Sequence, residues 1–312
     1  MSSPNRFLLI KAWGAGFWSD MEHVLGQLLI AELSERIPIV YWGKNSVYSG
    51  AEDTNAFEQF FLPVSAYSIH DLIRSDFTFY PEPWKFNNLF YEEGWPEKTV
   101  RTYYPLHTLY DRCENVLVSD CWLGIYLMEP IIKSTHPAFG LELDDIYRSL
   151  ISKYIRLQPD IEREIDDFYN ANLLGKTVLA VHVRGSDKIR ELGKLYELNN
   201  LYYSVIDHCL EENPAAFIFL LTESEDILAE YKSLYKEKLI YTDCQRTSND
   251  HALFWAEGID KRRMGIEILK DTYLAARCDS FIGNAHSNVS TAVKRLKQWP
   301  PNSLGLFSEK HL

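Results

Sequence analysis

Cysteines, basic side chains and long apolar runs are all scarce in this sequence of 312 residues. The five cysteines are widely spaced and form no C-x-x-C pair, which argues against a disulfide framework and against a zinc site. No apolar run reaches the roughly 18 residues of a membrane span, and the amino-terminal residues lack the apolar core of a signal peptide. We therefore expect a cytoplasmic protein that makes no integral membrane contact.

The charge balance and the missing motifs exclude further classes of protein. The 32 basic and 44 acidic side chains give a net charge of −12, which disfavours non-specific binding to nucleic acid. A D-x-D pair, which metal-dependent sugar transferases often use, is missing, and so is a P-loop lysine motif. The G-x-G-x-x-G fingerprint is also missing, which disfavours a dehydrogenase-like protein.

Strands alternating with helices predict parallel sheets in two segments of the chain. We expect strands at residues 7–10, 37–42, 178–183, 217–221, 239–241 and 280–282, and helices at residues 20–36, 201–211, 223–235, 265–276 and 287–297. A polar helical stretch is expected at residues 144–172. Two S/T-x-x-E capping boxes, at Ser19 and Thr222, mark expected helix starts.

The length favours two domains. We assign residues 1–172 to an amino-terminal α/β domain with aromatic-rich insertions, and residues 173–312 to a carboxy-terminal Rossmann-like domain. Residues 51–140 show no sustained periodicity.

The residues that follow the buried strand 178–183 are the first candidate site, because ligands bind at the carboxyl ends of parallel strands. Arg184, Asp187 and Lys188 place two cations and an anion next to Gly185, a combination that suits phosphate oxygens. A solvated turn is the alternative. His182, at the end of a buried strand, needs a polar partner and favours the functional interpretation, although a satisfied core histidine would also fit.

The second candidate site lies where the strand at residues 280–282 leads into a helix. The free amides of that helix start, with Ser287 and Asn288, could bind an anion. Simple helix capping would explain the serine equally well.

Five segments together resemble the fucosyltransferase superfamily, in particular the α-1,6-fucosyltransferases of animals and of rhizobial nodulation. HVRGSDK, at residues 182–188, is similar to the family's HxRxxDK signature, and HSNVSTAV, at residues 286–293, is similar to the motif near the end of its catalytic core. LTESEDILAEY and GIEILKDTYLAARCDSFIGN match the segments between these two. AWGAGFWSDMEHVLGQLLIA resembles the family's opening glycine loop and helix.

The resemblance implies a GT-B glycosyltransferase, with two Rossmann-like domains facing a central cleft. It implies inverting, metal-independent transfer of fucose from GDP-fucose to a hydroxyl of a glycan or glycoconjugate, without a cofactor.

The resemblance also assigns roles to individual residues. His182 would contact the nucleoside, and Arg184 would stabilise the charge that grows on the leaving diphosphate. Asp187 and Lys188 would hold their loop, and Asp271 would bind guanine. Ser287, Asn288 and the backbone of Gly14 and Gly16 would approach the diphosphate.

Two departures from the family pattern leave alternatives open. The family often has a second arginine where Gly185 stands; the available substitutes are Lys11, Lys261, Arg262 and Arg263. The spacing around Asp271 is shifted by about one residue, so a different nucleotide sugar remains an alternative donor.

The identity of the general base is a further open point. Glu191 is the candidate, with Asp20 or His23 as substitutes; a solvated carboxylate is the alternative for Glu191. A non-catalytic glycan- or nucleotide-binding relative is a further alternative to an enzyme. Four aromatic residues could stack on an acceptor sugar or simply pack in the core: Tyr80, Trp84, Phe86 and Trp95.

Overall fold

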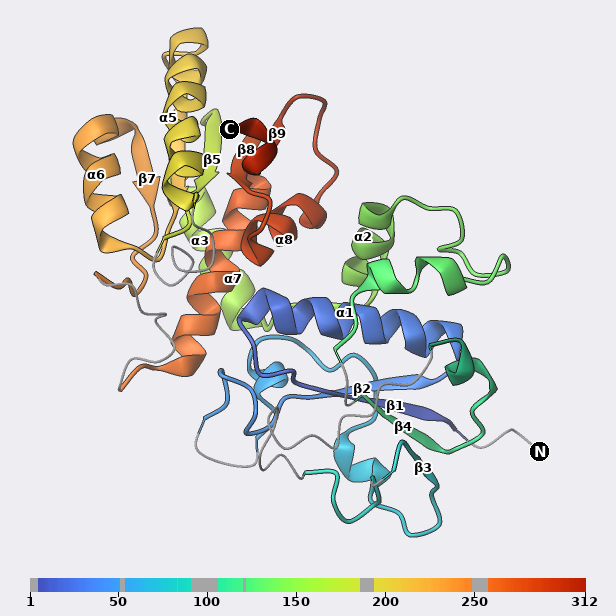
Figure 1. Ribbon diagram of the computed structural model, residues 1–312. Coiled ribbons are helices and arrows are strands. Elements are labelled where there is room, and N and C mark those ends of the chain that lie inside the picture. Colours follow the sequence, from blue (N-terminus) through green and yellow to red (C-terminus); the bar gives the residue numbers. More distant parts are fainter. Residues whose placement is uncertain are drawn as a thin grey trace. The chain divides into compact units, whose positions relative to one another are not determined.

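The computed structural model describes residues 5–50, 54–82, 84–90, 106–119, 122–185, 194–248 and 258–312. The chain divides into two compact units, Met1–Gln158 and Pro159–Leu312, each built around its own parallel sheet (Figure 1). The expected α/β class with two parallel sheets is therefore confirmed. No described helix is both long enough and apolar enough to cross a lipid bilayer.

The sheet of the first unit has the strand order β2-β1-β4-β3, and every pairing in it is parallel. Its strands are β1 (Phe7–Lys11), β2 (Ile37–Tyr41), β3 (Phe79–Tyr80) and β4 (Val116–Ser119). The apolar runs predicted β1 and β2. The sequence did not predict β3 and β4, which lie in the stretch without sustained periodicity.

Helix α1 (Phe17–Leu33) connects β1 to β2 and lies against both strands (Figure 1). Its N-cap is Gly16, so the capping box predicted at Ser19 is wrong. The backbone N–H of Phe17, which has no acceptor inside the helix, donates to the hydroxyl of Tyr48 at 2.9 Å. The Phe17 ring also packs edge-on against Tyr48 and Phe60, so aromatic packing rather than a serine fixes the helix start.

The rest of the first unit is made of short elements. Helix α2 (Leu143–Tyr154) contacts α1. The 3₁₀ helices are η1 (Ala56–Gln59), η2 (Ile69–Leu72), η3 (Leu106–Asp111), η4 (Ile125–Leu127) and η5 (Glu129–Ile131).

The sheet of the second unit has the order β7-β6-β5-β8-β9, again parallel throughout. Its strands are β5 (Val178–His182), β6 (Phe217–Leu221), β7 (Leu239–Tyr241), β8 (Ser280–Asn284) and β9 (Leu304–Phe307). From β5 the chain first builds outward through β6 to β7 and then returns to the other side of β5 as β8. The strand order therefore reverses between β5 and β8, and such a reversal is where open α/β sheets bind their ligands.

In the part of this unit that the structure describes, four helices connect the strands: α5 (Leu195–Glu212), α6 (Glu225–Tyr235), α7 (Lys261–Arg277) and α8 (Asn288–Leu296). The same residues also include two short 3₁₀ helices, η6 (Lys236–Lys238) and η8 (Glu309–His311). Helix α6 begins two residues later than predicted. Its N-cap is Ser224, whose hydroxyl accepts from the N–H of Ile227, so the capping box predicted at Thr222 is also wrong.

Helix α3 (Pro159–Asn172) belongs to the second unit, because it packs along α7. The guanidinium of Arg263 donates to both carboxylate oxygens of Glu164 at 2.8 Å, and Lys270 donates to the same carboxylate at 2.9 Å. The expected polar stretch at residues 144–172 is thus two helices, and the division between the units falls between them rather than after residue 172.

Candidate functional site

His182 and Asn284 end the two neighbouring strands at which the strand order of the second sheet reverses. His182 is only 5% exposed. Burial, with the nearby charge of Arg184, lowers the pKa of His182 to about 3, so its imidazole is neutral at physiological pH. A neutral imidazole has one donor nitrogen and one acceptor nitrogen, and its hydrogen bonds decide which is which.

The hydroxyl of Ser290, on α8, connects the two strand ends. Its Oγ lies 2.7 Å from Nδ1 of His182 and accepts from the backbone N–H of Asn284 at 3.1 Å. Gly283 makes this close approach possible, because a Cβ added there would lie only 2.4 Å from the Ser290 Oγ. The satisfied-histidine interpretation is therefore correct for Nδ1.

Arg184 follows β5 and forms an ion pair with Glu223, which follows the neighbouring strand β6. Both side chains are about three-quarters or more buried, and the backbone carbonyl of Arg184 accepts from Asn199 at 2.9 Å. The sequence analysis missed Glu223 as a partner of Arg184. The available signal was its position, because an acidic residue directly after the adjacent parallel strand reaches the same edge of the sheet.

Gly185 packs against the first turn of α6. A Cβ added at this position would lie 2.9 Å from Cδ1 of Ile227 and 3.2 Å from Cβ of Ser224. The family that the sequence resembles often has an arginine at this position. An arginine here would require the side chains of Ile227 and Ser224 to move.

The amino terminus of α8 begins directly after the β8 turn. Ser287 is its N-cap and makes no side-chain capping bond, so capping does not explain this serine. Ser287 is buried, whereas Asn288 is exposed. The first-turn amides of α8 have no acceptor within the helix, which suits an anion.

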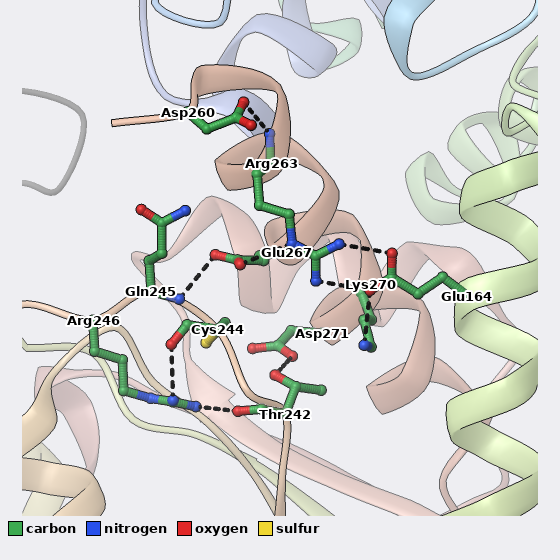
Figure 2. A network of polar contacts seen from close by, with 10 residues as sticks. All are labelled: Glu164, Thr242, Cys244, Gln245, Arg246, Asp260, Arg263, Glu267, Lys270 and Asp271. Atoms are coloured by element: carbon green, nitrogen blue, oxygen red, sulfur yellow. Dashed lines mark hydrogen bonds and ion pairs between the residues drawn. The ribbon is translucent and has the colours of Figure 1, made fainter. Parts of the chain in front are cut away.

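Asp271 lies on α7 within a polar network at the end of β7 (Figure 2). It is 9% exposed and accepts a hydrogen bond from the hydroxyl of Thr242. Burial raises the pKa of Asp271 to about 6. Strand β7 is the edge strand of the sheet, two strands away from β5, so this network is separated from His182 by the width of β6.

Glu267, one turn before Asp271, faces the segment that follows β7 (Figure 2). Its carboxylate accepts from the backbone N–H of Gln245 at 2.9 Å and from Arg263 at 3.0 Å. Arg246 donates to the carbonyls of Thr222, Thr242 and Cys244, which ties the carboxyl ends of β6 and β7 together. This edge of the sheet is thus held together by partly buried polar contacts.

The glycine loop of the first unit donates hydrogen bonds to the carboxylate of Asp20, in the helix that follows the loop. Asp20 is fully buried and accepts from the backbone N–H groups of Gly14 at 3.3 Å and of Ala15 at 3.1 Å. Gly14 has a φ of +86°, which favours glycine, and nothing lies within 4 Å of a Cβ added at Gly16. Because Asp20 holds the Gly14 amide, this amide is not free to bind a diphosphate.

Several of the substitutes considered for the general base and for the missing arginine have partners within their own units. The ring of His23 bonds to Ser119 at 2.9 Å and to the N–H of Leu123 at 3.3 Å. Lys11 is fully buried and donates to the carbonyl of Leu89 at 2.6 Å. Arg262 pairs with Asp160. The structure thus gives structural partners to His23, Lys11, Arg262 and Arg263.

Among the aromatic candidates, Trp84 is buried in the core of the first unit, and the Tyr80 ring stacks with the guanidinium of Arg112. Phe86 is 38% exposed. Trp95 lies outside the described residues, as do Asp187, Lys188 and Glu191. Within the described ranges, no three His, Cys, Asp or Glu side chains are grouped to hold a metal ion.

Two parallel α/β sheets, the second with its strand order reversed between β5 and β8, define a protein of two Rossmann-like units. No protein-family model and no curated protein matches the sequence.

Solved structures, however, share the fold. The α-1,6-fucosyltransferase NodZ soaked with GDP-fucose is similar over 94% of this chain and 92% of its own, with a TM-score of 0.61 and 19% identity. NodZ from Bradyrhizobium gives a TM-score of 0.62 at 18% identity, covering 93% of this chain and 92% of its own. POFUT1 in complex with GDP-fucose gives 0.54 at 14% identity over 99% of both chains. The resemblance to fucosyltransferases of the GT-B type is thereby confirmed at the level of the fold.

Proposed function

We propose that this protein is a glycosyltransferase that moves fucose from GDP-fucose to a hydroxyl of a glycan or glycoconjugate. The observation that carries the proposal is the convergence of His182, Arg184 and the amino terminus of α8 on the strand-order reversal of a fold shared with GDP-fucose-binding proteins. A nucleoside diphosphate can be bound by the hydrogen-bond donors found here: a neutral imidazole N–H, a guanidinium and the first-turn amides of a helix.

Arg184 would stabilise the negative charge that develops on the departing diphosphate. Its guanidinium is largely buried, where a charge interaction is stronger than in water, and the carboxylate of Glu223 is the ion-pair partner with which the donor diphosphate would compete. Ser287 and Asn288 would add side-chain bonds to the phosphate oxygens. The structure supports this role for Ser287, since its hydroxyl makes no capping bond.

Asp271 remains our candidate for binding the guanine base. Its carboxylate is an acceptor that suits the paired N–H groups of guanine, and the hydroxyl of Thr242 holds it in place. We further propose that transfer inverts the anomeric configuration and needs no metal. Glu191 remains the proposed base, because Asp20 and His23 already have hydrogen-bond partners within the first unit. Asp187 and Lys188 would hold their loop.

The first experiment is binding of GDP, UDP, CDP and ADP, measured by thermal shift and calorimetry, each with EDTA and with magnesium. We expect GDP alone to stabilise the protein, by about 2.7 kcal/mol at 100 times its dissociation constant, and EDTA to leave the shift unchanged. Preference for UDP or CDP would keep the fold and reject fucose as the sugar. Binding of GDP without hydrolysis or transfer of GDP-fucose would support a binding protein rather than an enzyme.

The matched variants are Arg184→Ala and Arg277→Ala. Each removes one arginine from the second unit, but Arg277 pairs with Asp166 of α3 and takes no part in the proposed site. Arg184→Ala should lower the rate of fucose transfer by about 10²–10³-fold, as the loss of one charge-stabilising contact typically does. Arg277→Ala should transfer fucose at the normal rate. Near-normal transfer by folded Arg184→Ala would refute the diphosphate role.

A further inference from the structure

Ser290 joins two groups, one on β5 and one on β8, that no motif connected. It lies on the first turns of α8, is fully buried, and contacts the ends of both strands at which the strand order reverses. Its neighbour Thr291 donates its hydroxyl to its own helix, at the carbonyl of Ser287. The hydroxyl of Ser290 instead forms hydrogen bonds with the ends of β5 and β8, so it holds groups of the candidate site together and does not cap its own helix.

The hydroxyl of Ser290 has one proton and can accept two hydrogen bonds. One acceptor position is taken by the backbone N–H of Asn284, which has only a proton to give. In the described part of the chain, the remaining partner of the hydroxyl is Nδ1 of His182. If Nδ1 carried the imidazole proton, it would donate to Ser290, and the buried Ser290 proton would have no acceptor, which is costly.

The alternative satisfies every group. When Ser290 donates to Nδ1, the Asn284 amide, the serine hydroxyl and Nδ1 are all paired, and the imidazole proton is on Nε2. We propose that Ser290 is a positioning residue that fixes His182 in the tautomer protonated on Nε2, so that this N–H donates to an oxygen of the bound nucleotide. The tautomer follows from the geometry alone, whereas its use by a nucleotide rests on the proposed function.

This assignment restricts what His182 does. An imidazole that accepts a hydrogen bond at Nδ1 and carries its proton on Nε2 cannot accept a further proton from a sugar hydroxyl at Nε2. His182 therefore acts as a fixed hydrogen-bond donor and not as the general base. The proton acceptor for transfer must be another group.

The direct test is nitrogen NMR of the full chain labelled with ¹⁵N-histidine, without nucleotide. The protonated and unprotonated nitrogens of neutral imidazole have well-separated chemical shifts, and the His182 signals, among those of nine histidines, are assigned as those missing from His182→Gln. We expect the proton on Nε2 in the wild type and in Thr291→Ala, the matched loss of a hydroxyl from α8. Ser290→Ala should show a mixture of tautomers. A proton on Nδ1 in the wild type would overturn the proposal, and this readout needs no variant of Ser290 to fold.

The second test compares two amides at position 182 by calorimetry with GDP. The glutamine amide reaches the place of Nε2 and can donate there, whereas the shorter asparagine amide reaches the place of Nδ1. We expect His182→Gln to bind GDP at least about tenfold more tightly than His182→Asn. Equal losses in both would overturn the donor role even if the tautomer is as proposed. Failure of the wild type to bind GDP would refute the proposed function and leave the tautomer to the NMR result.

Discussion

The buried carboxyl of Asp20 makes the stability of the first unit depend on pH. Asp20 is fully buried, and burial raises its pKa from 3.8 to about 7, although three backbone N–H groups oppose the shift. A carboxyl whose pKa is higher in the folded state takes up a proton on folding. Its contribution to the free energy of unfolding therefore falls as the pH rises from about 4 to about 7, and is level above that.

The size of the effect follows from the shift. One bound proton changes the free energy of unfolding by about 1.4 kcal/mol per pH unit, and Asp20 is half ionised at pH 7, so it should remove about 2 kcal/mol between pH 5 and pH 7. Asp20→Asn keeps the shape and abolishes this titration. The amide group of asparagine faces backbone N–H groups, which lowers stability by an amount that does not vary with pH.

The assay is denaturant unfolding of the wild type and Asp20→Asn at half-unit steps from pH 5 to pH 8. Folding also shifts the pKa values of His182 and Asp271, but both groups are present in both proteins, so the difference between the two profiles isolates Asp20. We expect the stability of the wild type relative to the variant to fall by about 2 kcal/mol between pH 5 and pH 7. A difference that stays flat, or grows with pH, would show that the loop amides keep Asp20 ionised and would refute the reasoning.

Three further predictions have defined outcomes. Gly283→Ala should lower the free energy of unfolding by about 2 kcal/mol in denaturant melts, because the new Cβ overlaps its neighbours; an unchanged midpoint would contradict the tight packing. Glu223→Gln should tighten GDP binding about fivefold in calorimetry, since GDP no longer competes for Arg184, and weaker binding would mean that Glu223 orients the arginine instead. Arg263→Ala should lower the free energy of unfolding by about 2 kcal/mol, because Arg263 donates to both carboxylate oxygens of Glu164. Arg262→Ala should lower it by under about 0.5 kcal/mol, because Arg262 forms a single ion pair with Asp160, and equal losses would refute this reasoning.

The strands and helices that the sequence predicted correctly are those with a strong apolar pattern. β5 and β6 match their apolar runs, and α7 needed only a few residues added at its start. The prediction missed β4, in the stretch of residues 51–140 that shows no sustained periodicity, and β9, another strand of four residues. The capping box at Ser19 was wrong because the motif gives no information on tertiary partners, such as the Tyr48 hydroxyl that accepts from the first amide of α1. The capping box at Thr222 was wrong because Ser224, two residues later, caps α6 instead.

The candidate site shows the same division. The placement of His182 and Arg184 was predictable, because each ends or follows a buried strand, and the carboxyl ends of parallel strands share one edge of the sheet. Their partners, Ser290 and Glu223, lie about 108 and 39 positions further along the chain, respectively. Only the strand order brings these residues to the same edge, and a single sequence gives no information on strand order.

The ion pairs between α3 and α7 determine where this protein can be divided for study. Asp160, Glu164 and Asp166 pair with arginines on α7, and Glu164 with Lys270 as well. A fragment that starts at residue 173 would leave these cations without their carboxylates and expose the apolar face of α7. A fragment of residues 159–312 keeps the helix together with His182, Arg184 and Asp271, and is therefore the piece to express when the proposed nucleotide site is studied in isolation.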